Sequence, residues 1–256
     1  MKTRLLRGVA AAALTLTVLL PGTIQPAQAN PDGPNTSLID MIDLALSLVG
    51  RASSGGVTPE ALAGMTQDVI NALNQAESAV IVHIDSIAAA NVRSDARHAV
   101  IEFDDINAFG EETLEDWAMD VTGAATRAAT YLDAVSDPRA IDDVGYAVVT
   151  LYPIALVARA RAGFSTTRLM ADYRAALQKI INKLAPTCRD HFPEPNTIPM
   201  IRAYTCTVYG VHTATQLEQN WFGTWKLGPI VPAAVEAASY ANTSRRVAIE
   251  ALAALP

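Results

Sequence analysis

The stretch VGYAVVTLYPIALVA, from Val144 to Ala158, contains no charged residue and determines how the rest of the chain has to fold. Two aspartates come directly before it, and two arginines follow shortly after it. A helix that is apolar on all its sides must be covered by neighbours, so it belongs in the centre of a group of helices. Pro153, inside this stretch, removes one backbone hydrogen bond and is expected to kink the helix.

The segments on either side of this stretch show the spacing of amphipathic helices. In residues 38–49, apolar side chains recur at every third or fourth position, with Asp40, Asp43 and Ser47 on the opposite side. This is the pattern of a helix with one buried face, and residues 114–135 repeat it. The sequence therefore predicts an all-α protein, an antiparallel helical bundle of six to seven helices joined by short loops.

The composition changes at Pro186, after which proline, threonine and aromatic residues become frequent. In this part, Tyr204–Val211 has strand-like character and Thr215–Trp221 is expected to be a short helix. Five parts are therefore predicted along the chain. They are a signal peptide (1–29), a flexible N-terminal tail (30–35), the helical bundle (36–185), a small irregular disulfide-containing aromatic segment (186–228) and a C-terminal helix packing on the bundle (229–256).

The N-terminus has the order of a secretory signal peptide. Lys2, Arg4 and Arg7 precede an apolar stretch at 8–20, which is too short to span a bilayer. Ala27-Gln28-Ala29 is a small-x-small cleavage site, so we expect cleavage after Ala29 and a secreted, extracellular protein. An N-terminal membrane anchor is the alternative. The abundance of alanine, and of arginine over lysine, is typical of a GC-rich bacterial genome.

The charge of the chain argues against two classes of partner. The formal net charge is −7, and the predicted signal peptide carries three of the cations, so its loss would leave −10. The chain contains no cluster of lysine and arginine. A nucleic-acid backbone or an anionic lipid surface is bound by several cations on one face, so we expect no nucleic-acid partner and no electrostatic adhesion to lipid.

Cys188 and Cys206 are the two cysteines of the chain. In the oxidising compartment that a signal peptide implies, two cysteines can form one intramolecular bond. The sequence therefore predicts a Cys188–Cys206 disulfide. Two free thiols or an intermolecular bridge are the alternatives.

No motif ties the chain to a reaction. The zinc-protease pattern His-Glu-x-x-His, the phosphate-binding Gly-Lys-Ser/Thr loop and the nucleophile elbow Gly-x-Ser-x-Gly are all absent, and we predict neither a metal site nor a cofactor. His98, Glu102 and Asp105 follow one another at helical spacing and could share a metal ion or a proton. An ordinary solvent-facing helix surface explains them better. His191, between the cysteines, is the other catalytic candidate.

Aromatic residues gather around the cysteines and are the better candidates for binding. Aromatic rings beside a few polar groups can hold a glycan or a protein partner, although the same rings could simply form the core of the segment. The residues concerned are Tyr204, Tyr209, Trp221, Phe222 and Trp225.

Three functional hypotheses follow from the sequence. The first is a secreted, non-enzymatic binding protein that acts through the aromatic segment. The second is a membrane-active, pore-forming-like protein that releases the apolar helix at 144–158; that stretch is short for a membrane span and is interrupted by Pro153. The third is an extracellular hydrolase whose site is assembled from distant residues, with His98 or His191 as general base. Whether the chain is an enzyme, and its oligomeric state, stay open.

Overall fold

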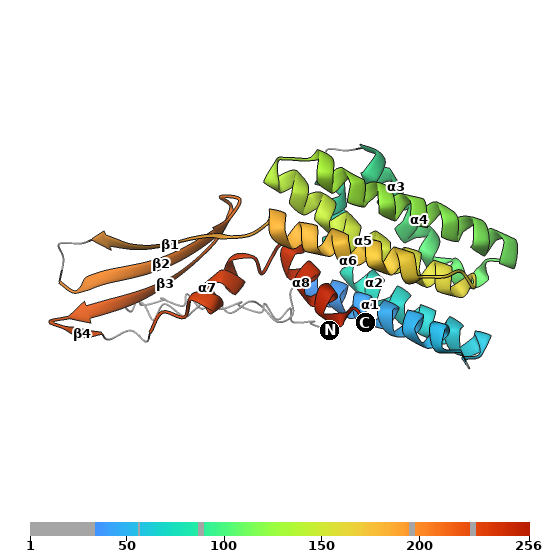
Figure 1. Cartoon of the computed structure of the whole chain (residues 1–256), viewed down its shortest axis with the longest axis horizontal. Coiled ribbons are helices and arrows are strands. Elements are labelled where there is room, and N and C mark those ends of the chain that lie inside the picture. Colours follow the sequence, from blue (N-terminus) through green and yellow to red (C-terminus); the bar gives the residue numbers. More distant parts are fainter. Residues whose placement is uncertain (1–33, 56, 87–89, 195–197, 226–228) are drawn as a thin grey trace, which may run out of the picture.

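A computed structural model of the chain describes residues 34–55, 57–86, 90–194, 198–225 and 229–256. Residues 34, 77–86, 194 and 225 are described by their backbone alone. The molecule is elongated, with a group of long helices at one end and a β-sheet that projects from them at the other (Figure 1). The predicted signal peptide and residues 30–33 of the predicted tail lie outside the described residues.

Helices form both ends of the described chain and flank the sheet in sequence. The helical elements are α1 (Pro34–Ser54), α2 (Pro59–Ser86), α3 (Ala90–Asp104), the 3-10 helix η1 (Ile106–Ala108), α4 (Glu111–Ala134), α5 (Pro138–Arg161), α6 (Thr167–Lys183), α7 (Pro232–Ser239) and α8 (Ser244–Ala254). The strands are β1 (Thr187–Glu194), β2 (Met200–Val208), β3 (His212–Trp221) and the two-residue β4 (Thr224–Trp225).

Helix α5 is the central element of the helical part. Every residue from Val144 to Ala158 is buried, which confirms the prediction from the uncharged stretch. Helices α1, α2, α3, α4, α6 and α8 all contact α5. Asp137 begins the helix, because its side chain accepts hydrogen bonds from the backbone N–H groups of Arg139 and Ala140. Pro153 lies inside α5, as expected from its place within the uncharged stretch.

The expectation of an all-α protein is wrong for residues 187–225, which form an antiparallel sheet with the strand order β1-β2-β3-β4. The predicted irregular segment is therefore regular, and Thr215–Trp221, expected to be a short helix, belongs to β3. Threonine, valine and tyrosine favour strands because their side chains fit a pleated, half-buried surface. A short run rich in such residues, as in Tyr204–Val208 of β2, is the sequence signal for a strand.

The disulfide prediction is confirmed, because Cys188 and Cys206 are bonded and lie directly opposite each other in β1 and β2. The predicted C-terminal helix is broken around Asn242, a break that the sequence also allows. It forms two helices, of which α7 packs on β2 and β3, while α8 packs on α1, α5 and α6. The break between them at Tyr240–Thr243 allows the chain to return from the sheet to the helices.

A network of buried hydrogen bonds joins the sheet to the helical part. Asp142 of α5 is 3% exposed; its Oδ1 accepts hydrogen bonds from the backbone N–H and the hydroxyl of Ser244, both at 2.7 Å. Its Oδ2 accepts one at 2.8 Å from the hydroxyl of Tyr209, in the turn between β2 and β3. Burial, together with the charge of Asp142, raises the pKa of Tyr209, so this hydroxyl stays protonated as a donor.

The first turn of α1 belongs to the same network. Asn35 was placed in the predicted flexible tail, but it is 8% exposed and lies inside α1. Its side-chain amide donates to the carbonyl of Ala241 at 2.9 Å and accepts from the hydroxyl of Tyr146 at 2.9 Å. Because Ala241 lies between α7 and α8, this contact fixes the break between those helices against α1 and α5.

Gly145 allows α5 and α8 to approach each other closely. A Cβ atom at this position would lie 2.2 Å from the hydroxyl oxygen of Ser244. We expect Gly145→Ala to lower the free energy of unfolding by about 2 kcal/mol, since one helix would have to move. Gly64→Ala is the matched control: Gly64 also lies inside a helix, with nothing within 4 Å of such a Cβ, so this change should raise stability by about 0.5–1 kcal/mol. Urea unfolding followed by circular dichroism measures both changes; equal stability of the two variants would contradict the close approach.

Candidate functional site

The two faces of the sheet have different surroundings. Cross-strand partners share a face and successive residues alternate between faces. Cys206, Ala214 and Val235 form a small core between one face and α7, with Cys188 and Tyr204 packed beside them. This face is therefore occupied by the chain itself.

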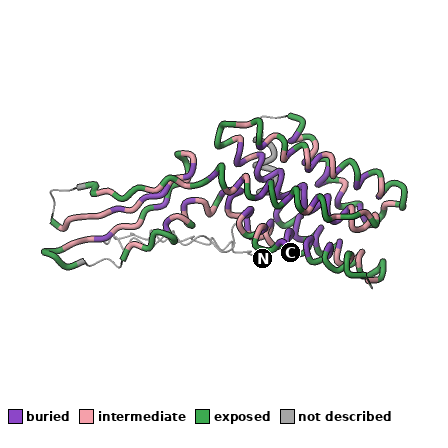
Figure 2. Tube along the Cα trace, in the orientation of Figure 1, coloured by how far each residue is buried: buried purple, intermediate pink, exposed green. Residues whose placement is uncertain are grey.

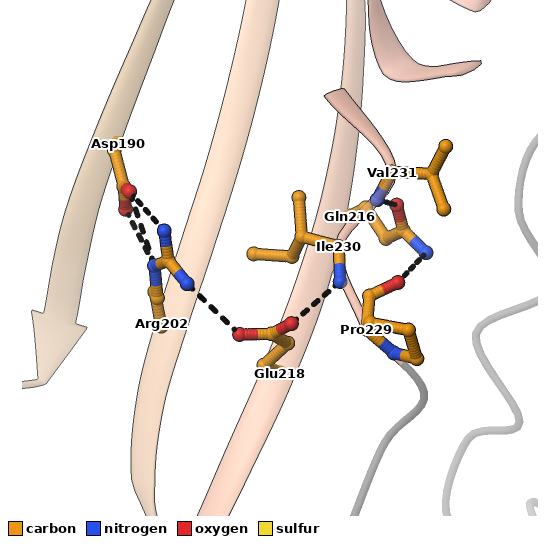
Figure 3. A network of polar contacts seen from close by, with 7 residues as sticks. All are labelled: Asp190, Arg202, Gln216, Glu218, Pro229, Ile230 and Val231. Atoms are coloured by element: carbon orange, nitrogen blue, oxygen red, sulfur yellow. Dashed lines mark hydrogen bonds and ion pairs between the residues drawn. The ribbon is translucent and has the colours of Figure 1, made fainter. Parts of the chain in front are cut away.

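Polar contacts secure the segment before α7 to the same face (Figure 3). Arg202 donates to Asp190 at 2.6 Å and to Glu218 at 3.2 Å. Glu218 accepts a hydrogen bond from the backbone N–H of Ile230 at 2.5 Å, and Gln216 accepts one from that of Val231 at 2.8 Å. The strands thereby fix the path of the chain into α7, and these side chains have a structural use.

The Arg202 guanidinium, through its hydrogen bonds, lowers the pKa of Asp190 below its usual value. A carboxyl group whose pKa is lower in the folded state contributes stability above its usual pKa. That contribution is lost as the pH falls through the lowered value. The Arg202–Asp190 pair therefore holds β1 to β2 at neutral pH and weakens only in acid.

The other face of the sheet carries rows of threonine. Thr187, Thr207 and Thr213 form one row across the three strands, and the hydroxyls of Thr207 and Thr213 lie 3.1 Å apart. Thr205 and Thr215 form a second pair, at 3.0 Å. Thr187, Thr213 and Thr215 are exposed. This face is polar, and Arg189, opposite Thr205, is a charged residue in its second row.

The end of the sheet away from the helices carries exposed apolar side chains. Among the described residues, nine large apolar side chains are exposed, and four of them lie at this end. We call these four residues the distal tip. They are Phe192 (45% exposed), Ile198 (68%), Trp221 (39%) and Phe222 (85%). The tube coloured by burial shows this end as mainly exposed or half-buried (Figure 2).

The turn between β3 and β4 presents Phe222 to solvent. Trp221 pairs with Thr224, so Phe222 and Gly223 form a two-residue hairpin loop. Both have positive φ, 49° and 89°. Such loops favour Asn-Gly, because the left-handed conformation is unfavourable for a bulky residue. A phenylalanine therefore occupies a position at which its backbone is strained and its side chain is outside the core.

The predicted aromatic candidates do not form one surface. Trp221 and Phe222 belong to the distal tip, whereas Tyr209 lies at the opposite end of the sheet, bonded to Asp142. Tyr204 is half-buried on the α7 face, and Trp225 lies in β4 with its side chain outside the described atoms. Ile198 was not among the candidates from the sequence, because an isolated isoleucine before a proline gives no sign that its side chain is exposed.

The predicted catalytic residues on α3 lie at the surface. The Nδ1 of His98 is 3.9 Å from a carboxylate oxygen of Glu102, beyond hydrogen-bond distance, and the His98 side chain is 65% exposed. Asp105 is exposed and precedes η1. The helical spacing does bring His98 and Glu102 to one face, but the described contacts give the histidine no hydroxyl or carboxylate at hydrogen-bond distance.

His191 lies on the threonine face of the sheet, opposite Ala203. It is half-buried, and its Nδ1 is buried without a hydrogen-bond partner among the described residues. A general base needs a partner within about 3 Å of its nitrogen, directly or through a water. No carboxylate or serine hydroxyl of the described residues takes that place.

No protein-family model, no curated protein and no solved structure matches this chain.

Four surface cavities in the described part of the chain are all lined by residues of the helical part. The largest of these four has a volume of about 780 Å³ and lies between α4 and α6. Arg159 and Arg168 lie at one end, and the ion pair of Asp133 with Lys179, at 2.7 Å, lies at the other. Thr122, Thr126 and Thr130 form its α4 side. Each of their hydroxyls donates to a carbonyl of its own helix, so it can only accept from a ligand.

Helix α5 is the one helix of the described chain that is long and apolar enough to cross a membrane. Of the stretch that meets this criterion, 89% is buried inside the protein. Its apolar surface is therefore used by the surrounding helices as core. Within the described residues, histidine, cysteine and acidic side chains form no group of three or more that could hold a metal ion.

Proposed function

We propose that this chain is an exported, non-enzymatic binding protein that presents the distal tip of its sheet to a partner outside the cell. The observation that carries the proposal is the placement of four large, exposed apolar side chains at the far end of a projecting sheet. Exposed apolar groups of this kind mark interaction sites, because a soluble protein otherwise buries them. The strained position of Phe222 supports it, since strained residues gather at functional sites.

The remainder of the molecule is suited to holding the tip rigidly. We propose that the helical part is an antiparallel bundle that serves as a base. The Cys188–Cys206 disulfide, helix α7 and the contacts of Arg202 stiffen the sheet along its length. A rigid projection loses little conformational entropy when its tip binds, which favours affinity.

The proposed compartment rests on two observations. Residues 1–29 have the pattern of a signal peptide cleaved after Ala29. The disulfide is stable where the surroundings are oxidising, outside the cytosol. The composition supports a bacterial source. We expect mass spectrometry of the secreted protein to find Asn30 as its first residue.

Binding to the surface of the cells that produce the protein tests the function. We expect the purified protein to sediment with intact cells, and Phe222→Asn to lower the bound fraction at least fivefold, since a buried phenylalanine side chain stabilises an interface by about 1.5–3 kcal/mol. Asparagine is favoured at positive φ, so this variant should fold at least as well as the parent protein.

Ile101→Gln and Met119→Gln are the matched controls. Ile101 is 65% exposed on α3 and Met119 is 54% exposed on α4, so both remove exposed apolar surface away from the tip. Both should bind as well as the unchanged protein. Sedimentation that is insensitive to Phe222→Asn, or equally sensitive to the controls, would show that the tip is not the contact surface.

A further inference from the structure

We propose that the partner of the distal tip is a lipid bilayer, into whose interfacial region Phe192, Ile198, Trp221 and Phe222 insert. This inference rests on the proposed function and names the chemistry of its partner. The whole sheet would act as a rigid spacer, with the tip in the membrane and the helical part in water.

The size of the apolar surface favours lipid over protein. Given their exposed fractions, the four side chains offer on the order of 450 Å² of apolar surface, since aromatic side chains bury 150–250 Å² each. A stable protein interface takes about 800 Å² from each partner. A protein would have to contact the threonine face of the sheet as well. A bilayer interface needs only the apolar tip.

The shape of the tip leads to the same partner. Phe222 lies in a tight two-residue hairpin loop directly after Trp221, and Ile198 lies two residues before the first residue of β2 at the same end. The tip is therefore convex, and none of the four cavities in the described residues includes a residue of the sheet. Tryptophan and phenylalanine are the residues that anchor proteins at membrane interfaces.

The charges of the sheet lie behind Trp221 and Phe222, around the level of Phe192 in β1. Glu218 and Arg202 are cross-strand partners, three residues inside Trp221, which places them about 10 Å from it along the strand. The backbone of Glu194 lies opposite Ile201, about 7 Å inside Trp221. An interfacial segment is buried by about 5–10 Å. Insertion to that depth leaves the Arg202–Glu218 pair at the level of the lipid headgroups or in water.

The charge of the whole chain determines which lipid should be bound. The formal net charge of the full chain is −7, or −10 without the three cations of the predicted signal peptide, and the tip side chains carry no charge. Anionic lipids attract clusters of cations, which the tip lacks. Binding should therefore be apolar, at least as strong to zwitterionic phosphatidylcholine as to vesicles that contain phosphatidylglycerol, and unaffected by high salt.

Flotation with protein-free phosphatidylcholine vesicles tests the proposal with the full secreted chain. We expect the protein to float with the vesicles in low and in high salt. Phe222→Asn and Trp221→Thr should each lower the partition coefficient at least fivefold, while Ile101→Gln and Met119→Gln leave it unchanged. Circular dichroism and urea unfolding of each variant, showing native stability, separate loss of binding from loss of fold.

A fifth variant distinguishes the tip from the face of the sheet. Thr215 is exposed in the middle of the threonine face, so Thr215→Lys leaves the tip intact and changes the surface that a protein partner would need. It should bind vesicles as the unchanged protein does. An equal loss of binding in Thr215→Lys and Phe222→Asn would overturn insertion by the tip.

The remaining outcomes also decide the proposal. Absence of flotation by the unchanged protein, release in high salt, or equal loss in the helical controls would overturn it. The proposed function fails separately: if the protein binds cells through Phe222 but does not bind vesicles, the tip is a binding surface whose partner is a protein or glycan. If it binds neither, both proposals are wrong.

Discussion

Asp142→Ala should lower the free energy of unfolding by about 3 kcal/mol, a large effect for one polar side chain. Asp142 receives three hydrogen bonds, from the backbone N–H and hydroxyl of Ser244 and from the hydroxyl of Tyr209. Its carboxylate also lies at the N-terminus of α8, where a negative charge is favourable. Without it, buried donors lose their acceptor, and that loss is costly in the protein interior.

The consequence should extend to the relative placement of the two parts of the molecule. Asp142 contacts the β2–β3 turn through Tyr209 and α8 through Ser244, so its removal loosens both at once. Hydrogen exchange should increase at the backbone amides near Tyr209 and Ser244 before it increases within α5. Urea unfolding measures the total effect.

Asp116→Ala is the control for this variant. Asp116 is an exposed acid of α4 that forms no hydrogen bond or ion pair within the described part of the chain. Its replacement should change stability by less than about 0.5 kcal/mol. An Asp142 variant as stable as the Asp116 variant would contradict the network described here.

The second large effect is expected from Cys188→Ala combined with Cys206→Ala. The bonded cysteines are separated by 18 positions in the chain, and a loop of that size stabilises the folded state by about 3 kcal/mol in the chain-entropy model. The sheet projects from the helical part; α7 packs on β2 and β3, while Val208, at the end of β2, packs in the core of the helices. We therefore expect the sheet to become the first part of the variant to unfold.

Limited proteolysis at 187–225, compared with the helical part, measures this change. Reduction of the unchanged protein should reproduce the behaviour of the variant, and its tip-dependent binding should weaken in parallel. Unchanged protease resistance after reduction would mean that pairing with β2 and packing under α7 hold β1 in place without the disulfide.

The aromatic candidates show why a site is harder to predict than a fold. From the sequence, Tyr204, Tyr209, Trp221 and Phe222 were equivalent members of one aromatic segment. The sheet places Tyr209 beside the helices and Phe222 at the far end. Alternation along a strand determines which residues share a face, but it does not say which end of a hairpin is buried against another element.

The local pattern of side chains was sufficient to predict the central helices, and the cysteine count was sufficient to predict the disulfide. The uncharged stretch at 144–158 required a helix covered on every side, because it has apolar side chains all round and their removal from water is favourable. Two cysteines in the same chain left one possible intramolecular bond. These features depend on periodicity and composition, which are properties of the sequence itself.

The tertiary structure decided which residues meet. The strands of residues 187–225 are stabilised by pairing with each other, and strand preference depends on that context more than helix preference does. Asp142 was one of two acids at the start of α5 in the sequence, and only the return of α8 makes it a buried acceptor. The exposure of Phe222 likewise depends on a turn that points away from the helices. Contacts between distant segments arise from packing, and no local pattern encodes them.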